Sequence, residues 1–272
     1  MPFIIVSILA LLLIGWLAGE PFYIAYRRRL MRGRPFPEAW RRILRQRVPY
    51  LRSLPADLQI QLKQHMQVFI AEKKFIGCDG LIVTDEMRIT IAAQACLLIL
   101  NRRTDYYPNL RQILIYPGPF IVDKAQPDAA GVLHQQRRVL IGESWSQGQV
   151  VLSWDDIIEG AAVVDDGHNV VIHEFAHQLD QEAGYANGAP RLASQAQYAS
   201  WSQVLSAEFN NLQERTRLQQ PSLLSDYGAT DPVEFFAVAS EVFFEQPQHM
   251  AAEYPALYNE LSRFYRVHPL SW

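Results

Sequence analysis

Two histidines four residues apart, with a glutamate beside the first, stand in the stretch VVIHEFAHQLD at residues 170–180. On a helix, His173 and His177 lie one turn apart on the same side, so both imidazoles can bind one cation. Zn²⁺ accepts imidazole nitrogens, and catalytic zinc sites use three protein ligands and leave one position for water. Glu174 can reach that water as a general base, which is the H-E-x-x-H arrangement. The spacing therefore predicts one Zn²⁺ per chain and a hydrolytic reaction.

The other residues of this segment are mostly apolar, so the helix is expected to be buried. Ionisable groups buried without partners would cost several kcal/mol, and a bound metal removes that cost. The alternative interpretation is two exposed histidines on a partly buried helix. Asp180 follows His177 by three residues. It can orient the ligand imidazole or lie at a solvated helix end, and the sequence leaves both open.

The third ligand has to come from a later segment, because no histidine follows at the short spacing of the extended motif. The apolar segment DPVEFFAVASEVFF supplies Glu234 and Glu241, seven residues apart on one helical face. If one binds the metal, the backbone or a basic residue must hold the other, and spacing alone does not choose between them. The downstream candidates together are His249, His268, Glu208, Glu214, Glu234, Glu241 and Glu245.

The elements that must position these residues follow from periodicity and from proline and glycine breaks. RQILIYPGPFIVD predicts a strand, a turn and a strand, and RRVLIGESWSQGQVVLSW predicts two more strands connected by residues 142–148. QVVLSW is either an edge strand that can pair with an extended peptide or an interior strand. The fold class is α+β, mainly helical with a small mixed β-sheet. Helices are expected over residues 40–74 with a break at Pro49, 87–102, 170–180, 198–219 and 231–246.

The N-terminal segment has a different character. Residues 2–18, PFIIVSILALLLIGWLA, contain no charge and are close to the length that crosses a bilayer. Five arginines lie within residues 27–34 and none precedes the run, which predicts a single-pass transmembrane helix in the cell inner membrane with a cytoplasmic domain. A cleaved signal peptide is the alternative, but it would have positive charge before the run. The predicted organisation is an anchor over 1–26, a basic, proline-containing linker over 27–39 and a metallopeptidase domain over 40–272.

Composition adds two constraints. The chain has 272 residues, 49% of them hydrophobic, which is enough for one sizeable core. Its net charge is −3, and this argues against nucleic acid as a partner, which would need a basic face. The two cysteines, Cys78 and Cys96, are too few for a disulfide framework and fit reduced thiols in a cytosolic domain.

Four segments in the same order, LIYPGPFIVD, GQVVLSWDDI, HEFAHQLD and DYGATDPVEFFAVASEVFF, closely resemble the Mlc titration factor A family of zinc peptidases. The resemblance covers about residues 50–270 and implies a zincin-like fold. The site also resembles that of the anthrax lethal factor catalytic domain. The resemblance implies that Glu234, in the DP-x-E step, joins His173 and His177 as the third zinc ligand, and that Glu174 is the base. It further implies that Tyr227 donates a hydrogen bond to the oxyanion of the reaction.

The function implied by the resemblance is zinc-dependent hydrolysis of peptide bonds, with a peptide or protein as substrate and a gluzincin-like ligand set. A sugar-responsive transcriptional regulator is the protein partner that the family suggests, and the N-terminal apolar run is a departure from its soluble members. The alternative function is a membrane-tethered, zinc-containing module that docks a regulatory protein without turnover. Structural zinc sites usually have four protein ligands, whereas three are found here, which favours the enzyme.

Overall fold

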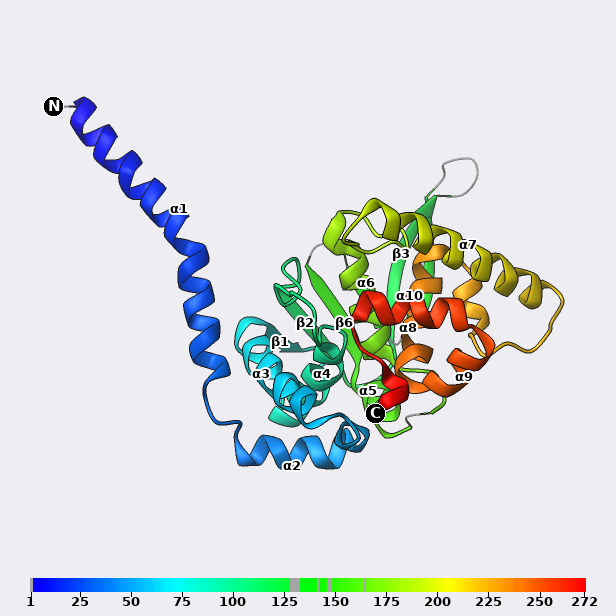
Figure 1. The fold of residues 1–272 in the computed structure, drawn as a ribbon. Helices are drawn as coiled ribbons and strands as arrows, with labels where there is room; N and C mark the ends of the chain where they lie inside the picture. Colours follow the sequence, from blue (N-terminus) through cyan, green and yellow to red (C-terminus); the bar gives the residue numbers. More distant parts are fainter. Residues whose placement is uncertain (1, 128–132, 141, 146–147, 164) are drawn as a thin grey trace.

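A mixed β-sheet lies beside the helices in the computed structural model, which describes residues 2–127, 133–140, 142–145, 148–163 and 165–272 (Figure 1). Its strands, in spatial order, are β1 (Lys74–Gly77), β2 (Gln112–Tyr116), β6 (Gln149–Ser153) and β5 (Gly142–Trp145). β1, β2 and β6 run parallel, and β5 pairs antiparallel with β6. β6 therefore has a partner on each side. It is an interior strand, and the interpretation of QVVLSW as a free edge is wrong.

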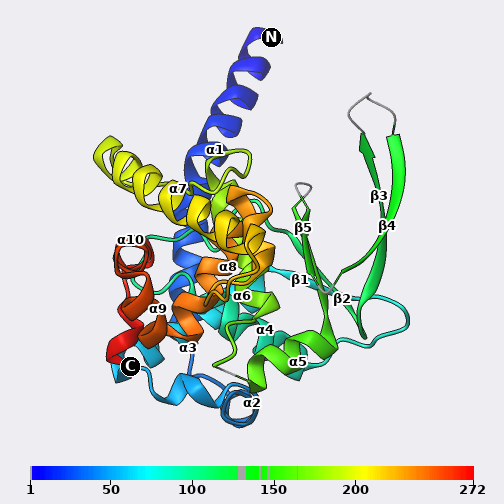
Figure 2. The same cartoon turned by 90° about the vertical axis from the view of Figure 1, so that its right-hand side faces the viewer.

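A separate antiparallel pair consists of β3 (Phe120–Pro127) and β4 (Leu133–Leu140). Figure 2 shows this pair extending beside the four-stranded sheet. The predicted strand, turn and strand over residues 111–123 correspond to β2 and the start of β3. The predicted connection over residues 142–148 instead contains β5, because Glu143 and Ser144 pair with Val151 and Val150 of the neighbouring strand.

Each predicted helical segment contains a helix, whereas the helices over residues 154–162, 247–253 and 255–265 were not predicted. The α+β class with mainly helical content is confirmed. Single turns of 3-10 helix lie between several of them, namely η1 (Pro49–Arg52), η2 (Gln181–Ala183) and η3 (Asp226–Ala229), and η4 (Pro269–Ser271) follows the last helix. The α-helices of the described residues are α1 (Pro2–Arg32), α2 (Glu38–Arg47), α3 (Ala56–Glu72), α4 (Asp85–Leu97), α5 (Trp154–Ala162), α6 (Val170–Asp180), α7 (Gln195–Arg217), α8 (Pro232–Glu245), α9 (Pro247–Glu253) and α10 (Pro255–Tyr265).

The two helices that carry the motif residues begin at side-chain caps. The Asn169 Oδ1 atom accepts a hydrogen bond from the Ile172 backbone N–H at 3.1 Å and starts α6. Asp231 accepts from the N–H groups of Val233 and Glu234 at 2.8 and 3.0 Å, and Pro232 occupies the first turn of α8. Such caps satisfy N–H groups that a helix start leaves unpaired. The register of both helices is therefore fixed by local sequence.

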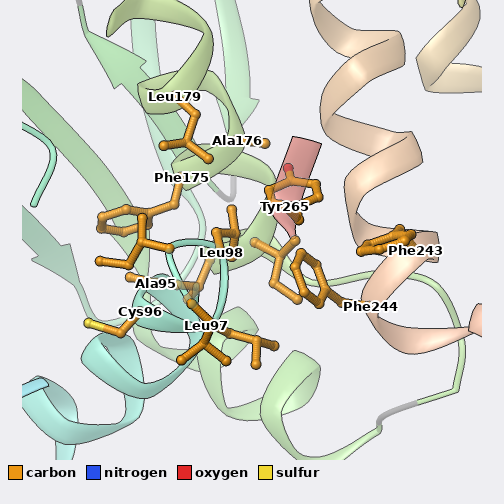
Figure 3. Packing of buried hydrophobic residues seen from close by; sticks show 14 of the residues in the cluster. Ala95, Cys96, Leu97, Leu98, Phe175, Ala176, Leu179, Phe243, Phe244 and Tyr265 are labelled. Atoms are coloured by element: carbon orange, nitrogen blue, oxygen red, sulfur yellow. The ribbon is translucent and has the colours of Figure 1, made fainter. Parts of the chain in front are cut away.

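The hydrophobic core joins α4, α6 and α8. Figure 3 shows Phe175 and Leu179 of α6 on one side of Leu98, and Tyr265 and Phe243 on its other side. Phe175 and Phe243 are fully buried, and burying a phenylalanine side chain contributes about 1.5–3 kcal/mol. Close packing of this kind holds α6 and α8 in one fixed relative position. Cys96 is also buried in this cluster, as expected for a core thiol.

The N-terminal helix α1 extends away from the rest of the chain (Figure 1) and continues through Arg32, so the first part of the predicted linker is helical. Near its end, Arg28 forms a two-point ion pair with Glu72 of α3, at 2.8 and 2.9 Å. Within the part of the chain that the structure describes, no helix combines the length and the apolar character needed to cross a membrane. The transmembrane prediction for residues 1–26 is thus not supported.

Candidate metal centre

Three side chains from α6 and α8 bring a nitrogen or oxygen atom to one point. The Nε2 atoms of His173 and His177 are 3.2 Å apart. The Oε2 atom of Glu234 lies 3.0 Å from the first and 3.4 Å from the second. The ligand triad implied at the level of sequence is therefore assembled in space, although its members come from helices about 60 residues apart in the chain.

The dimensions of this triangle suit a metal ion. Ligand atoms at about 2.0–2.1 Å from a tetrahedral Zn²⁺ are separated from one another by about 3.3 Å. The three observed separations run from 3.0 to 3.4 Å. The side chains are mostly buried, with 13%, 9% and 19% of His173, His177 and Glu234 exposed. These residues can hold a metal ion, and a set of three protein ligands is typical of a catalytic site rather than a closed structural one.

Glu241 occupies the other side of the first imidazole. Its Oε1 atom is 2.7 Å from Nδ1 of His173, and its Oε2 atom accepts a hydrogen bond from the Asn169 backbone N–H at 2.5 Å. The choice between the two glutamates of α8 is thereby resolved, because Glu234 faces Nε2 and Glu241 faces Nδ1. A carboxylate at Nδ1 fixes the ring orientation and leaves Nε2 as the metal-binding atom.

Charge within the cluster keeps Glu234 ionised. Burial by itself would raise the pKa of this carboxyl, but hydrogen bonds to His173 and His177 hold the pKa well below its usual range. Burial by itself would lower the pKa of His173. The nearby carboxylates of Glu241 and Glu234 have the larger effect, so the pKa is raised. The site thus carries more negative than positive charge around the imidazoles. An arrangement of this kind favours binding of a cation.

The two predicted catalytic side chains line one cavity of about 550 Å³ together with His173 and Glu241. Glu174 is buried there, with 4% of its surface exposed. Tyr227, in η3, is half exposed, and its ring centroid lies 5.9 Å from that of His173. Burial and the nearby Glu234 carboxylate raise the pKa of Tyr227. Its phenol therefore stays protonated and can donate a hydrogen bond into the cavity.

Asp180, the last residue of α6, has neither of the roles considered from the sequence. It is completely buried, and its Oδ2 atom accepts from the N–H groups of Asn187 and Gly188 at 2.9 and 2.7 Å. Within the described residues, Nδ1 of His177 has no hydrogen-bond partner, so Asp180 does not hold that imidazole. Burial raises the pKa of Asp180. The carboxyl instead fixes the loop that follows the motif helix.

The remaining candidates for a third ligand lie elsewhere. His249 and His268 are exposed. Glu214 pairs with Arg217 at 2.6 Å. Glu208 and Glu245 accept hydrogen bonds from asparagine side chains, Asn211 for the first and Asn169 for the second. The described part of the chain brings only His173, His177 and Glu234 into a metal-binding group.

Asn169 is a functional position that the sequence reasoning missed. Besides capping α6 and binding Glu241, its side-chain Nδ2 donates to Oε1 of Gln94 at 2.6 Å and to Oε1 of Glu245 at 2.9 Å. It is 1% exposed. An asparagine directly before an apolar helical run is a helix-start signal that could have identified the cap. Its contacts with α4 and α8 could not be read from the sequence.

A three-ligand cluster at a cavity, with a glutamate and a tyrosine beside it, is the arrangement that metal-dependent hydrolases use. The chain belongs to the glucose-regulated metallo-peptidase M90 family, whose model matches residues 23–266. It is thus a member of a metallopeptidase family, and the predicted family resemblance is confirmed.

Relatives cover most of the chain. Mlc titration factor A of Klebsiella pneumoniae subsp. pneumoniae is 38% identical over 227 residues, which is 82% of this chain and 84% of the relative. Mlc titration factor A of Enterobacter sp. is 36% identical over 226 residues, with the same two shares. An uncharacterized protein of Synechocystis sp. is 37% identical over 271 residues, covering 99% of this chain and 98% of its own.

Proposed function

We propose that this protein is a zinc-dependent peptidase of the gluzincin type, with His173, His177 and Glu234 as the ligands of one Zn²⁺. The observation that carries the proposal is the triangle of three ligand atoms, whose edges of 3.0–3.4 Å match those of a tetrahedral site. Imidazole and carboxylate ligands in this number are the set that catalytic zinc uses. Membership in the M90 family supports the peptidase reaction.

Bound zinc would act as a Lewis acid, lowering the pKa of a water and polarising the scissile carbonyl. Glu174 takes a proton from the attacking water and passes it to the leaving amine nitrogen. Its position supports this role, because it follows a ligand directly in sequence and lines the cavity. Tyr227 donates its phenolic hydrogen to the carbonyl oxygen as negative charge develops there. Its raised pKa supports the role of donor.

The Glu174→Gln variant of the full chain tests the proposal. Metal content, measured by elemental analysis, should stay at one Zn²⁺ per chain, because the amide leaves the ligands in place. Cleavage of short fluorogenic peptides should fall by a factor of about 10²–10⁴, the usual contribution of a general base. Glu38→Gln is a matched control, since Glu38 is an exposed glutamate of α2 outside this cavity and should leave cleavage unchanged. Full activity in Glu174→Gln would refute the assignment.

We also propose a regulatory protein as a binding partner. The support is the name of the relatives, in which Mlc appears as the titrated factor. A binding assay between the full chain and purified Mlc tests this, with Glu174→Gln as a non-hydrolysing form. Binding without any peptide cleavage by the unsubstituted chain would instead support the docking module. The inner-membrane location with a cytoplasmic domain stays a prediction, and cell fractionation of the full chain decides it.

A further inference from the structure

A second cavity, of about 450 Å³, lies on the molecule away from the metal centre. Its wall is built by the loop after α4, by η2, by the start of α7 and by the end of α10, and α10 packs against α7 (Figure 1). No residue of this wall lines the cavity that holds Glu174 and Tyr227. Five arginines belong to it: Arg102, Arg103, Arg191, Arg263 and Arg266.

Each of the three acids in the wall has an arginine partner. Asp105 pairs with Arg28 of α1. Glu260 accepts hydrogen bonds from Arg263 at 3.0 Å and from Ser200 at 2.5 Å. The third acid, Glu182, lies 3.9 Å from Arg102, which is the limit of an ion pair.

Three of the arginines are not held in ion pairs within the described residues. Arg103, Arg191 and Arg266 are exposed and form no ion pair with any residue that the structure describes. The first turn of α7, which contributes Gln197, adds the positive end of a 23-residue helix. The wall as a whole is therefore positive, although the protein is negative.

Arg102 is the least exposed of the five arginines in this wall. Its guanidinium carbon lies 4.0 Å above the Phe264 ring, and 11% of its side chain is exposed. Its Nη1 atom is buried and has no hydrogen-bond partner among the described residues. Burial lowers the pKa of this guanidinium. The positive charge of this guanidinium adds to that of the exposed arginines around the cavity, and arginines in such number favour an anion.

We propose that this cavity binds a small organic phosphate, with the phosphate on the arginines and the apolar part against Pro108 and Leu192. Its volume is in the range of small-molecule sites. Arginine forks match phosphate oxygens in pairs, so the more highly charged phosphate is favoured over a carboxylate. The proposal is independent of the peptidase assignment, because the two cavities share no residue.

Calorimetric titration of the full chain with phenyl phosphate tests the proposal. Saturable binding of one molecule per chain is expected, and benzoate and inorganic phosphate should bind more weakly. Phenol should not bind. Absence of saturable phenyl phosphate binding overturns the proposal, as does tighter binding of benzoate or phenol.

Two variants locate the site. Arg103→Gln and Arg191→Gln each remove one exposed charge and should weaken phenyl phosphate binding by about tenfold. Arg42→Gln is the matched control, because Arg42 is an exposed arginine outside this cavity, and it should bind like the unsubstituted chain. Equal affinities in all three variants would place the phosphate elsewhere and overturn the assignment. Peptide cleavage by Arg103→Gln gives a separate readout of the metal centre and should be unchanged.

Discussion

The Glu241 carboxylate contacts both Asn169, which caps α6, and His173, a candidate metal ligand of the same helix. Its Oε1 atom lies 2.7 Å from Nδ1 of His173, while its Oε2 atom accepts from the Asn169 N–H at 2.5 Å. Asn169 caps α6, His173 stands one turn further along, and Glu241 itself lies on α8. One buried carboxylate therefore sets both the orientation of an imidazole and the distance between the two helices that form the metal centre.

Replacement of Glu241 by glutamine should weaken metal binding without removing a ligand. The amide keeps one acceptor oxygen, so either His173 or the Asn169 N–H loses its partner. Loss of such an orienting contact typically lowers metal affinity by about 10–100-fold. Competition with a chromophoric chelator measures the affinity. Glu245→Gln is the control, because Glu245 is buried and contacts Asn169 but not His173. Unchanged affinity in Glu241→Gln would show that the contact has no orienting role.

Replacement of Tyr227 by phenylalanine should lower the rate of peptide cleavage with little change in zinc content. Loss of one oxyanion donor costs about 10²–10³ in kcat, and KM should change far less because the interaction develops in the transition state. Steady-state kinetics on a short peptide measures both constants. Tyr185→Phe is the control, since Tyr185 is 83% exposed and lies outside the cavity. A kcat equal in both variants would assign Tyr227 to packing alone.

Glu245 should make the stability of the protein dependent on pH. Burial raises the pKa of this carboxyl from 4.5 to about 8. Repulsion from Asp166 and Glu241 adds to the rise, and a hydrogen bond from Asn169 opposes it. A carboxyl with a raised pKa contributes its full stability below the unfolded value near 4.5 and loses it as pH rises through about 8. Relative to the unsubstituted chain, Glu245→Gln should gain on the order of 3 kcal/mol between about pH 5 and pH 8. Urea unfolding at both pH values measures the gain, and a constant difference between the two proteins would contradict it.

Gly188 should tolerate no side chain, because the loop fixed by Asp180 passes close to the start of α8. Its φ is +77°, and a Cβ there would lie 2.3 Å from the carbonyl oxygen of Pro232, two residues before Glu234. Gly80 has the same φ of +77° with nothing within 4 Å of such a Cβ. Gly80→Ala should cost about 1–2 kcal/mol from the backbone alone, and Gly188→Ala should cost more and weaken metal binding. Thermal unfolding and metal titration compare the two, and equal effects would rule out the close approach.

Much of the fold could be predicted because its signals are local. The apolar period of residues 170–180 predicted α6, and Asp231–Pro232 predicted the start of α8, where the Asp231 cap is indeed formed. β5 was missed because a four-residue strand has almost no pattern of its own and forms by pairing with β6. The pairing of β6 on both sides was equally undetermined, since the register of a strand depends on which neighbours reach it.

By itself, the sequence determined the chemistry of this protein: two imidazoles one helical turn apart, a glutamate between them, and acids on a later apolar helix. Only the tertiary structure decided that Glu234 faces Nε2 of His173 while Glu241 holds Nδ1, and that Asp180 fixes a loop rather than a ligand. The physical reason is range. Helical periodicity acts over a few residues, whereas the contacts that assign each carboxylate its role arise from the packing of α6 against α8, across more than 60 residues of chain.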